Sequence, residues 1–356
     1  MAKFSDVLTI INGRNQKQVE CENGKYPIYG SGGIMGYAND YICEAETVII
    51  GRKGNINKPI FVETPFWNVD TAFGLCANRK KLNPKYLYYF CEKFDFEKLN
   101  TTVTIPSLTK ANLLSIEIPL PDLNQQERIS TYFDKVSDLI SLRKQQLAKL
   151  DELVKARFVE MFGECSSIRP QKLKEVTRRV KVGFVGTCEK YYTDNTGVPM
   201  LRTTNITSHG IDLKDLKYVT KTFHEKNLKS QVHKGDLLIA RHGSNGQANV
   251  YYGDEAQCLN AIIIEPDSNI TNPIFLVNLI NSRRVKRQIE KELVGSTQHV
   301  LNTTTLANVE VEIPAIKDQQ AFAAFVERVD QQKRTVQQSL EKLELMKKAL
   351  MQEYFG

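Results

Sequence analysis

The sequence lacks the features that mark membrane, secreted and disulfide-rich proteins. None of its apolar stretches approaches the roughly 20 residues that cross a bilayer, and its first residues have no apolar run of the kind found in signal peptides. The seven cysteines are scattered, odd in number and include no Cys-x-x-Cys pair, which argues against a disulfide framework and a zinc ribbon. We therefore expect a cytoplasmic protein with no membrane partner and with reduced, partly buried cysteines.

Signatures of nucleotide and metal chemistry are also missing. Residues 51–58 lack the Gly-Lys-Ser/Thr ending of a phosphate-binding loop, so we expect no ATP hydrolysis by this chain. Residues 30–33 are rich in glycine, but Met35 occupies the last glycine place of a dinucleotide fingerprint, and a turn is the better interpretation. The five histidines include no His-x-x-x-His pair, so their spacing predicts no metal site.

Two segments resemble a catalytic motif without matching it. Asn-Pro-Lys-Tyr at residues 83–86 and Asn-Pro-Ile-Phe at residues 272–275 are similar to the Asn-Pro-Pro-Tyr/Phe signature of adenine methyltransferases. Those enzymes keep the second proline, which is missing from both segments. Because Asn is a common N-cap and Pro suits the first helical turn, we interpret both segments as the starts of helices.

The chain does carry a net positive charge and enough apolar residues for ordinary cores. Lysine and arginine number 48 against 41 acidic residues, a net charge of +7 that suits a polyanionic partner. With 356 residues, 41 % of them hydrophobic, the length indicates two or three globular domains.

The end of the chain repeats an earlier part of it. Residues 102–163 align with residues 295–356 without a gap, at a constant shift of 193 positions (295 − 102). Matched pairs include Gln126 with Gln319 and Leu147 with Leu340. A repeat of this length indicates one structural unit used twice.

Each copy of the repeat contains a long predicted helix. Apolar residues recur at alternating steps of four and three, which is typical of a coiled coil. Pro121 and Pro314 precede the helices, and about 38 residues at roughly 1.5 Å each give a rod of about 57 Å. The predicted seam consists of Ile129, Phe133, Val136, Ile140, Leu147, Leu150 and Val154 in the first copy, and Phe322, Val326, Val329, Val336, Leu340, Leu343 and Leu350 in the second.

The order of the segments predicts how the helices pair. The chain runs from a globular segment into a rod, and then through a second globular segment into a second rod. The second rod starts where the chain leaves the second globular segment, so it has to run back along the first. We therefore predict an antiparallel coiled coil with pseudo-twofold symmetry and a globular segment at each end. In the alternative arrangement, each helix pairs with another copy of the chain.

The two globular segments share a framework but differ in their loops. Short β-branched runs separated by Gly, Asn, Asp and Pro predict strand-rich, mixed α/β domains, and hence an α+β fold class for the chain. A shared framework is typical of a structural role, whereas variable loops are typical of recognition. The corresponding stretches are 24–29 with 196–201, 47–54 with 236–243, and 83–90 with 272–279.

Polar side chains follow a predicted strand at the same place in both segments. Arginine binds guanine through two hydrogen bonds, Asn and Gln do the same for adenine, and Lys suits phosphate. These loops are therefore candidate DNA-binding sites, although each residue by itself is also compatible with a solvated polar loop. The candidates are Arg52, Lys53, Asn55, Asn57 and Lys58 in the first segment, and Arg241, His242, Ser244, Asn245 and Gln247 in the second.

A further set of polar residues in the second segment is a weaker candidate for DNA contact. Such side chains pair with phosphate or base edges, but equally with the local backbone. They are Arg202, Thr204, Asn205, Ser296 and Gln298.

Two variable segments alternating with two similar long helices resemble the specificity subunit of type I restriction-modification systems. The resemblance is strongest in the stretches that lead into the helices, IPLPDLNQQERI at residues 118–129 and IPAIKDQQAF at residues 313–322, and in the Phe-Gly that closes each repeat. It covers essentially the whole chain. It implies target-recognition domain 1 at residues 1–117, a central spacer helix at 118–163, target-recognition domain 2 at 164–312 and a C-terminal spacer helix at 313–356.

The resemblance also implies a role in the recognition of double-stranded DNA. Each recognition domain would read one half of a bipartite target, and the helices would fix the unread gap between the halves. The subunit itself would be non-catalytic and would bind no cofactor. Two methylation subunits would dock on its helices and use S-adenosylmethionine to methylate adenine, and restriction subunits would use ATP and Mg to translocate and cut DNA.

Two other functions remain open at the level of the sequence. A self-sufficient adenine-N6 DNA methyltransferase would bind S-adenosylmethionine as an isolated chain. A coiled-coil interaction protein with no DNA role would show no salt-sensitive binding to any duplex.

Overall fold

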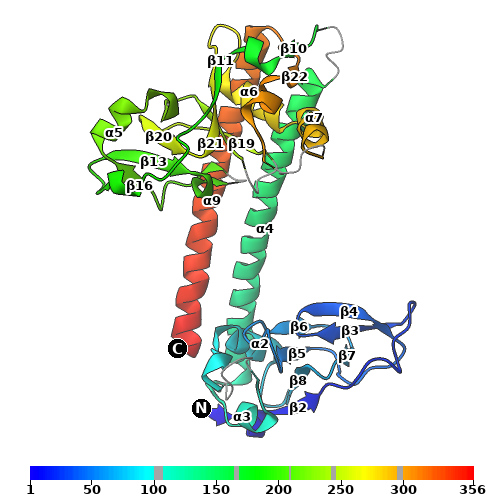
Figure 1. Cartoon of the computed structure of the whole chain (residues 1–356). Helices are drawn as coiled ribbons and strands as arrows, with labels where there is room; N and C mark the ends of the chain where they lie inside the picture. Colours follow the sequence, from blue (N-terminus) through cyan, green and yellow to red (C-terminus); the bar gives the residue numbers. More distant parts are fainter. Residues whose placement is uncertain (100–106, 164–167, 208–209, 242–245, 295–299) are drawn as a thin grey trace. The chain divides into compact units, whose positions relative to one another are not determined.

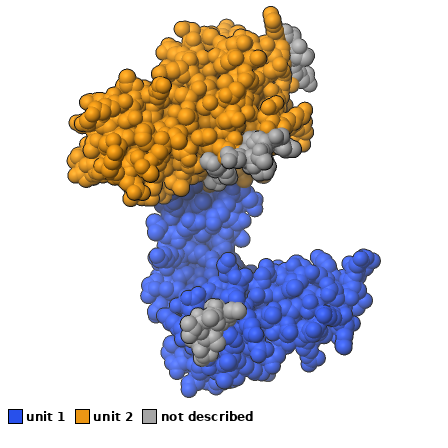
Figure 2. Space-filling model, in the orientation of Figure 1, with its two compact units in different colours: residues 1–146, 336–356 blue, residues 147–335 orange. Residues whose placement is uncertain are grey.

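The computed structural model describes residues 1–99, 107–163, 168–207, 210–241, 246–294 and 300–356. The chain divides into two compact units (Figure 2). Unit 1 consists of residues 1–146 and 336–356, and unit 2 of residues 147–335. Two 40-residue helices, α4 (Leu123–Phe162) and α9 (Ile316–Phe355), each contribute one part to each unit (Figure 1).

Unit 1 is built on two small sheets. All five residues of β5 are buried, as expected for a β-branched run inside a core. In the order across each sheet, the strands are β2 (Leu8–Asn12), β8 (Ala72–Ala77), β5 (Thr47–Gly51) and β6 (Ile60–Val62), all antiparallel, and β4 (Gly33–Ala38), β3 (Tyr26–Gly30) and β7 (Trp67–Asn68). The remaining elements are β1 (Ala2–Lys3), α1 (Phe4–Val7), α2 (Pro84–Lys93), η1 (Phe96–Leu99), α3 (Lys110–Leu114) and β9 (Glu117–Ile118), with β1 paired to β9.

The predicted glycine-rich turn is confirmed as a hairpin between β3 and β4. Gly30 pairs with Gly33, so Ser31 and Gly32 form a two-residue connection. Gly33 has a φ of +119°, a backbone conformation that side chains with a Cβ rarely adopt. Glycine at position 33 therefore allows the backbone conformation that this turn requires.

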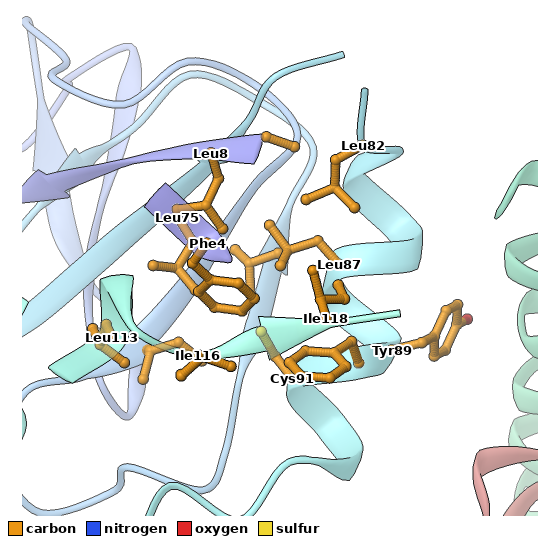
Figure 3. Packing of buried hydrophobic residues seen from close by; sticks show 14 of the residues in the cluster. Phe4, Leu8, Leu75, Leu82, Leu87, Tyr89, Cys91, Leu113, Ile116 and Ile118 are labelled. Atoms are coloured by element: carbon orange, nitrogen blue, oxygen red, sulfur yellow. The ribbon is translucent and has the colours of Figure 1, made fainter. Parts of the chain in front are cut away.

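The core of unit 1 lies between its four-stranded sheet and α2. Phe4, Leu75 and Leu87 meet there (Figure 3), and each is fully or almost fully buried. The helix α2 also contacts α4, where Lys85 Nζ and Tyr89 Oη both donate to the Asp134 carboxylate at 2.7 Å. The helix therefore joins the sheet to the long helix.

Unit 2 has a larger set of sheets on a similar plan. One sheet has the order β11 (Thr177–Val182), β21 (Ala261–Pro266), β18 (Leu237–Ala240) and β19 (Ala248–Val250); the other has β12 (Tyr192–Thr193), β16 (Lys217–Val219), β13 (Val198–Arg202), β20 (Ala256–Leu259) and β17 (Gln231–Val232). The unit also contains two strand pairs, β10 (Gln171–Lys172) with β22 (Glu310–Val311) and β14 (Ile206–Thr207) with β15 (Gly210–Ile211). The helices are η2 (Leu173–Glu175), η3 (Glu189–Tyr191), η4 (Thr203–Asn205), α5 (Lys221–Lys226), η5 (Leu228–Ser230), α6 (Pro273–Asn281), α7 (Arg283–Val294) and α8 (Thr303–Ala307).

The two units share one internal plan, as the sequence repeat predicts. The sheet order β2-β8-β5-β6 of unit 1 corresponds to β11-β21-β18-β19 of unit 2. In each unit a further sheet contains one parallel pair, β3 with β7 and β13 with β20. The stretches matched by sequence, 47–54 and 236–243, therefore contain equivalent strands, and the mixed α/β fold with long helices is confirmed.

The two segments that resemble a methyltransferase motif are helix starts, as predicted. Asn83 caps α2 by accepting a hydrogen bond from the Tyr86 N–H at 3.0 Å, and Asn272 caps α6 by accepting from the Ile274 N–H at 2.9 Å. The Tyr86 ring is buried and its hydroxyl donates to the Pro119 carbonyl at 3.0 Å. Both segments thus have a structural explanation.

A buried glutamine fastens each of these caps to a long helix. Gln126 accepts from the Asn83 N–H at 2.8 Å and donates to the carbonyls of Lys81 and Pro121. Gln319 makes the same three bonds in unit 2, accepting from the Asn272 N–H at 2.8 Å and donating to the carbonyls of Ile270 and Pro314. Neither glutamine has any exposed surface. We call each arrangement the glutamine clamp.

The long helices pair antiparallel inside each unit. In unit 1, Phe133 of α4 stacks on Phe355 of α9 with ring centroids 5.8 Å apart, and Lys144 bonds Glu344 at 3.1 Å. In unit 2, Phe158 contacts Phe322 at 5.4 Å, and Asp151 forms an ion pair with Lys333. In both units the residue number rises along one helix as it falls along the other, so the pairing lies within the chain.

All the predicted seam residues are buried or half-buried. Ile129, Phe133, Val136, Val154, Phe322, Val326, Val329, Val336 and Leu340 are buried; Ile140, Leu147, Leu150, Leu343 and Leu350 are half-buried. Among the helices of the described residues, none combines the length and apolar character needed to cross a membrane.

Candidate nucleic-acid interface

The loop after β5 presents the candidate residues of unit 1 to solvent. Arg52, Lys53, Asn55, Asn57 and Lys58 are all exposed, whereas Ile56 between them is buried. The backbone of the loop is held at its start, because the Arg52 N–H donates to the Thr71 carbonyl at 2.8 Å. A fixed backbone with exposed side chains is suited to contact with a large ligand.

Asn57 differs from its neighbours in this loop. Its Nδ2 donates to Asp95 at 3.0 Å and its Oδ1 accepts from the Phe96 N–H at 2.8 Å. The amide therefore holds the loop to η1. In contrast, the side chains of Lys53, Asn55 and Lys58 make no hydrogen bond or ion pair with the part of the chain that the structure describes. DNA contact by all five residues stays a prediction.

The loop between β18 and β19 carries the candidates of unit 2. Arg241 is half-buried and donates from Nε to the Leu301 carbonyl at 3.2 Å and from Nη1 to Asn260 Oδ1 at 3.1 Å. Gln247 is half-buried at the other end of the loop. Three further candidates, His242, Ser244 and Asn245, lie outside the described residues.

The two arginines occupy equivalent positions, as the sequence alignment predicts. The Arg52 carbonyl accepts from the Leu108 N–H at 3.0 Å, and the Arg241 carbonyl accepts from the Leu301 N–H at 3.1 Å. Leu108 and Leu301 are matched positions of the repeat, because 301 − 108 is the same shift of 193. One backbone framework thus carries Arg52 in one unit and Arg241 in the other.

The weaker candidates of unit 2 divide into exposed and buried residues. Thr204 is exposed, but Asn205 is only 3 % exposed. Asn205 accepts from the Arg202 N–H at 2.9 Å and donates to the Asp212 carbonyl at 3.0 Å, and the Arg202 guanidinium bonds Asp215. These bonds favour the backbone-capping alternative for Asn205. Ser296 and Gln298 lie outside the described residues.

Asn260 joins two of these segments and was not predicted from the sequence. Its carbonyl accepts from Thr203 Oγ1 at 3.3 Å, and its side chain accepts from Arg241. Its φ of 55° lies in the left-handed region, which Asn tolerates better than most residues. The only hint in the sequence is the residue type, because Asn tolerates the left-handed conformation. An isolated Asn after a strand is too common for this hint to predict the junction. Asn260 therefore joins the turn at 202–205 to Arg241.

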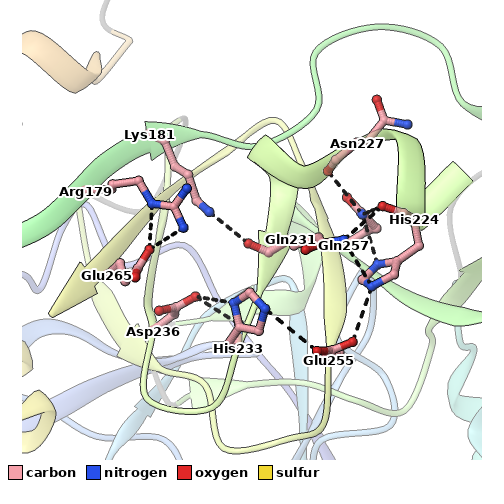
Figure 4. Close-up of polar contacts among 10 residues, drawn as sticks. All are labelled: Arg179, Lys181, His224, Asn227, Gln231, His233, Asp236, Glu255, Gln257 and Glu265. Carbon is pink, nitrogen blue, oxygen red and sulfur yellow. Dashed lines mark hydrogen bonds and ion pairs between the residues drawn. The ribbon is translucent and has the colours of Figure 1, made fainter.

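The described histidines of unit 2 belong to a polar network rather than a metal site (Figure 4). His224 is buried and its Nδ1 lies 3.0 Å from Gln257 Nε2, while its Nε2 lies 3.4 Å from Glu255. His233 lies 3.9 Å from both Glu255 and Asp236. Within the described ranges, no group of three or more His, Cys, Asp or Glu side chains is placed to hold a metal ion.

The described cysteines form no disulfide. All six are free thiols, and Cys43, Cys91, Cys188 and Cys258 are buried. Burial raises the pKa of Cys43 to about 12 and that of Cys258 to about 12, so both thiols stay protonated near neutral pH. A protonated, buried thiol is a poor nucleophile.

Comparison with known proteins gives a consistent result over both halves of the chain. The family model of the type I restriction modification DNA specificity domain matches residues 1–152 and 180–345. A putative type I restriction enzyme specificity subunit of Haemophilus influenzae is 23 % identical over 344 residues, covering 92 % of this chain and 86 % of that protein. The EcoBI specificity subunit of Escherichia coli is 20 % identical over 338 residues, covering 86 % of this chain and 70 % of that protein.

Solved structures resemble the fold of the whole chain. The S subunit of a type I restriction-modification system from M. genitalium has a TM-score of 0.65 at 15 % identity, covering 100 % of this chain and 95 % of that one. A chain from a structure of type I R-M complex assembly has a TM-score of 0.59 at 15 % identity, with 99 % and 96 % covered. At this identity the likeness concerns the fold alone.

Proposed function

Because this chain belongs to the type I restriction-modification DNA specificity family, we propose that it reads a bipartite target on double-stranded DNA, with one half-site for each recognition domain. Specificity subunits of type I systems bind DNA and assemble with the other subunits of the complex. The chain supplies specificity rather than catalysis, and its relatives support this role rather than that of a self-sufficient methyltransferase.

The observation that carries the proposal is the repeated framework with unlike loops. Both units have the same order in their four-stranded sheet and the same glutamine clamp, and in both a matched leucine N–H donates to the loop arginine carbonyl. The sequences that follow the two arginines differ, with Lys53 after Arg52 in one unit and His242 after Arg241 in the other. Equivalent loops that carry different side chains in the two units are suited to the recognition of two different base sequences.

The long helices suit the role of a spacer between the half-sites. Each 40-residue helix is roughly 60 Å long at about 1.5 Å per residue. That length exceeds one turn of B-DNA, about 34 to 36 Å. A single continuous site would need no such length, whereas a split site with an unread gap does.

The remaining parts of the proposal concern partners and cofactors. Two methylation subunits would dock on the exposed faces of the helices, where apolar residues such as Leu139 and Leu153 are 42 % and 46 % exposed. Methyl transfer from S-adenosylmethionine, and ATP- and Mg-dependent translocation and cleavage, would belong to the methylation and restriction subunits.

Methylome sequencing tests the proposal directly. Cells that carry the complete system are expected to show methylated adenines in one split, asymmetric motif with a fixed gap. Cells that lack only this chain are expected to lose that motif. A continuous motif, or a motif that survives the loss of this chain, would contradict the proposed function.

A further inference from the structure

Helix α7 of unit 2 is the most basic helix of the described chain outside the long pair, and the proposed reading loops leave it unexplained. Its sequence RRVKRQIEKELV has five basic residues and two acidic ones. Its position next to the described end of the β18–β19 loop suggests a role in DNA binding.

The inner face of α7 is firmly attached to unit 2. Val285 and Ile289 are each 1 % exposed and belong to the main core of the unit. Gln288 donates to the Glu310 carbonyl and accepts from the Glu310 N–H, both at 2.9 Å. Arg284 forms an ion pair with Glu312 at 2.6 Å. The helix is therefore a rigid support for whatever its other face carries.

The outer face of α7 carries basic side chains in a row. Arg283, Arg287 and Lys291 are exposed and recur every four residues, which places them on one side of the helix. Glu290 is exposed at the edge of this face. Neither Arg283 nor Arg287 has a hydrogen bond or ion pair with any described residue. We call Arg283 and Arg287 the α7 arginine pair.

The helix lies directly beside the loop predicted to read DNA. A Cβ atom added at Gly246, in the β18–β19 loop, would lie 3.7 Å from Lys286 Nζ and 3.8 Å from Ile289 Cδ1. Arg241, at the start of the same loop, bonds Leu301, which follows α7 in the chain and packs in the same core cluster as Ile289. Helix α7 therefore lies against Gly246, at the described end of this loop, through Lys286 and Ile289, and it carries the arginine pair on its outer face.

Unit 1 has no counterpart of α7 among its described residues. Between α2 and α3 the described part of that unit contains only η1, whereas unit 2 has α7 between the equivalent α6 and α8. The basic helix is thus an addition to the shared framework, and its effect on binding should belong to unit 2.

We propose that the α7 arginine pair binds backbone phosphates of the duplex next to the half-site read by unit 2. This inference rests on the proposed function, and it adds a contact that supplies affinity without reading sequence. Guanidinium groups bind phosphate oxygens through paired hydrogen bonds, and a rigid helix holds two of them at a fixed spacing. Phosphate contacts fix the register of a protein on DNA, while the neighbouring loop is free to contact bases.

The salt dependence of DNA binding tests the inference. The full chain carrying Arg283→Gln and Arg287→Gln is titrated with a labelled mixed-sequence duplex at several salt concentrations. Each lost phosphate contact is expected to reduce the slope of log K against log salt by about 0.9, or roughly 1.8 for the pair. Discrimination between the cognate and altered half-sites is expected to stay as in the unchanged chain.

Lys226→Gln with Lys229→Gln provides a control of equal charge. Both lysines are exposed, Lys226 in α5 and Lys229 in η5. In the view of Figure 1, α5 lies on the opposite side of unit 2 from α7. An equal loss of slope in this control would assign the effect to net charge and overturn the inference, as would an unchanged slope in the α7 variant. If the unchanged chain binds no duplex in a salt-dependent way, the proposed function itself fails.

Discussion

Gln126 and Gln319 illustrate how single buried side chains organise this protein. Each amide satisfies one backbone N–H and two backbone carbonyls where a loop, a helix cap and a long helix meet. Buried polar groups that lose their partners cost free energy, about 1 to 3 kcal/mol each. The clamp thus fixes the start of α4 against α2, and the start of α9 against α6.

Gln319→Ala is expected to lower the free energy of unfolding of unit 2 by at least about 3 kcal/mol, because three backbone groups lose a buried partner at about 1 kcal/mol or more each. Urea denaturation of the full chain, followed by a signal from unit 2, measures the change. Gln320 is the matched control because it is the exposed neighbour on the same helix, and Gln320→Ala is expected to change stability by less than about 0.5 kcal/mol. Equal effects of the two substitutions would show that the clamp has no special role.

Asn55 and Gln247 offer a reciprocal test of independent reading. Asn55 lies in the exposed loop of unit 1 and Gln247 in the equivalent loop of unit 2. If each contacts a base, Gln247→Ala relaxes one half-site by about 1 to 3 kcal/mol of discrimination, and Asn55→Ala relaxes only the other. Competition binding with duplexes altered in either half measures this. A loss in both halves from either single substitution would rule out separate reading domains.

At the scale of elements, aromatic clusters fasten the long helices to each unit. In unit 2, Phe158 and Phe162 of α4 contact Phe275 of α6 and Phe322 of α9, with ring centroids 5.0 to 5.8 Å apart. In unit 1, Phe355 contacts Tyr86 at 5.1 Å, in the place where Phe162 contacts Phe275 in unit 2. The repeat thus preserves a contact between elements as well as the elements themselves.

Phe322→Ala is expected to destabilise unit 2 by about 3 to 5 kcal/mol, since it leaves a cavity in an aromatic cluster that has no exposed surface at this position. Val159→Ala on α4 is the control, because Val159 is 62 % exposed. Thermal unfolding of both variants gives the comparison. A similar small shift for both would mean that α9 is held mainly by contacts elsewhere.

At the scale of the whole molecule, helix length is predicted to set the gap between half-sites. A heptad added both within residues 140–150 of α4 and around Glu344 of α9 keeps the apolar seam in register. Seven residues lengthen each helix by about 10 Å, or roughly three base pairs of B-DNA. Methylome sequencing with this variant is therefore expected to show a gap longer by about three base pairs.

A replacement of the same stretch by a different heptad of equal length is the control, and its gap is expected to stay unchanged. An unchanged gap in the lengthened variant would refute the role of the helices as a spacer.

Features that depend on periodicity and on local residue chemistry were accessible from the sequence. The alternating steps of four and three predicted both long helices, and Asn83-Pro84 and Asn272-Pro273 predicted two helix starts. The repeat at a shift of 193 predicted that both units share one plan, because similar sequences aligned without a gap form similar local structures. Antiparallel pairing followed from the order of the segments along the chain.

Only the tertiary structure decided which polar side chains are used internally. Asn57 and Asn205 were DNA-binding candidates beside Lys53 and Thr204, yet their amides hold η1 and the turn at 202–205. The glutamine clamps, the junction at Asn260 and the packing of α7 beside Gly246 likewise join residues distant in the chain. A sequence records the residue type, but hydrogen bonding depends on which backbone groups the fold brings within about 3 Å of it.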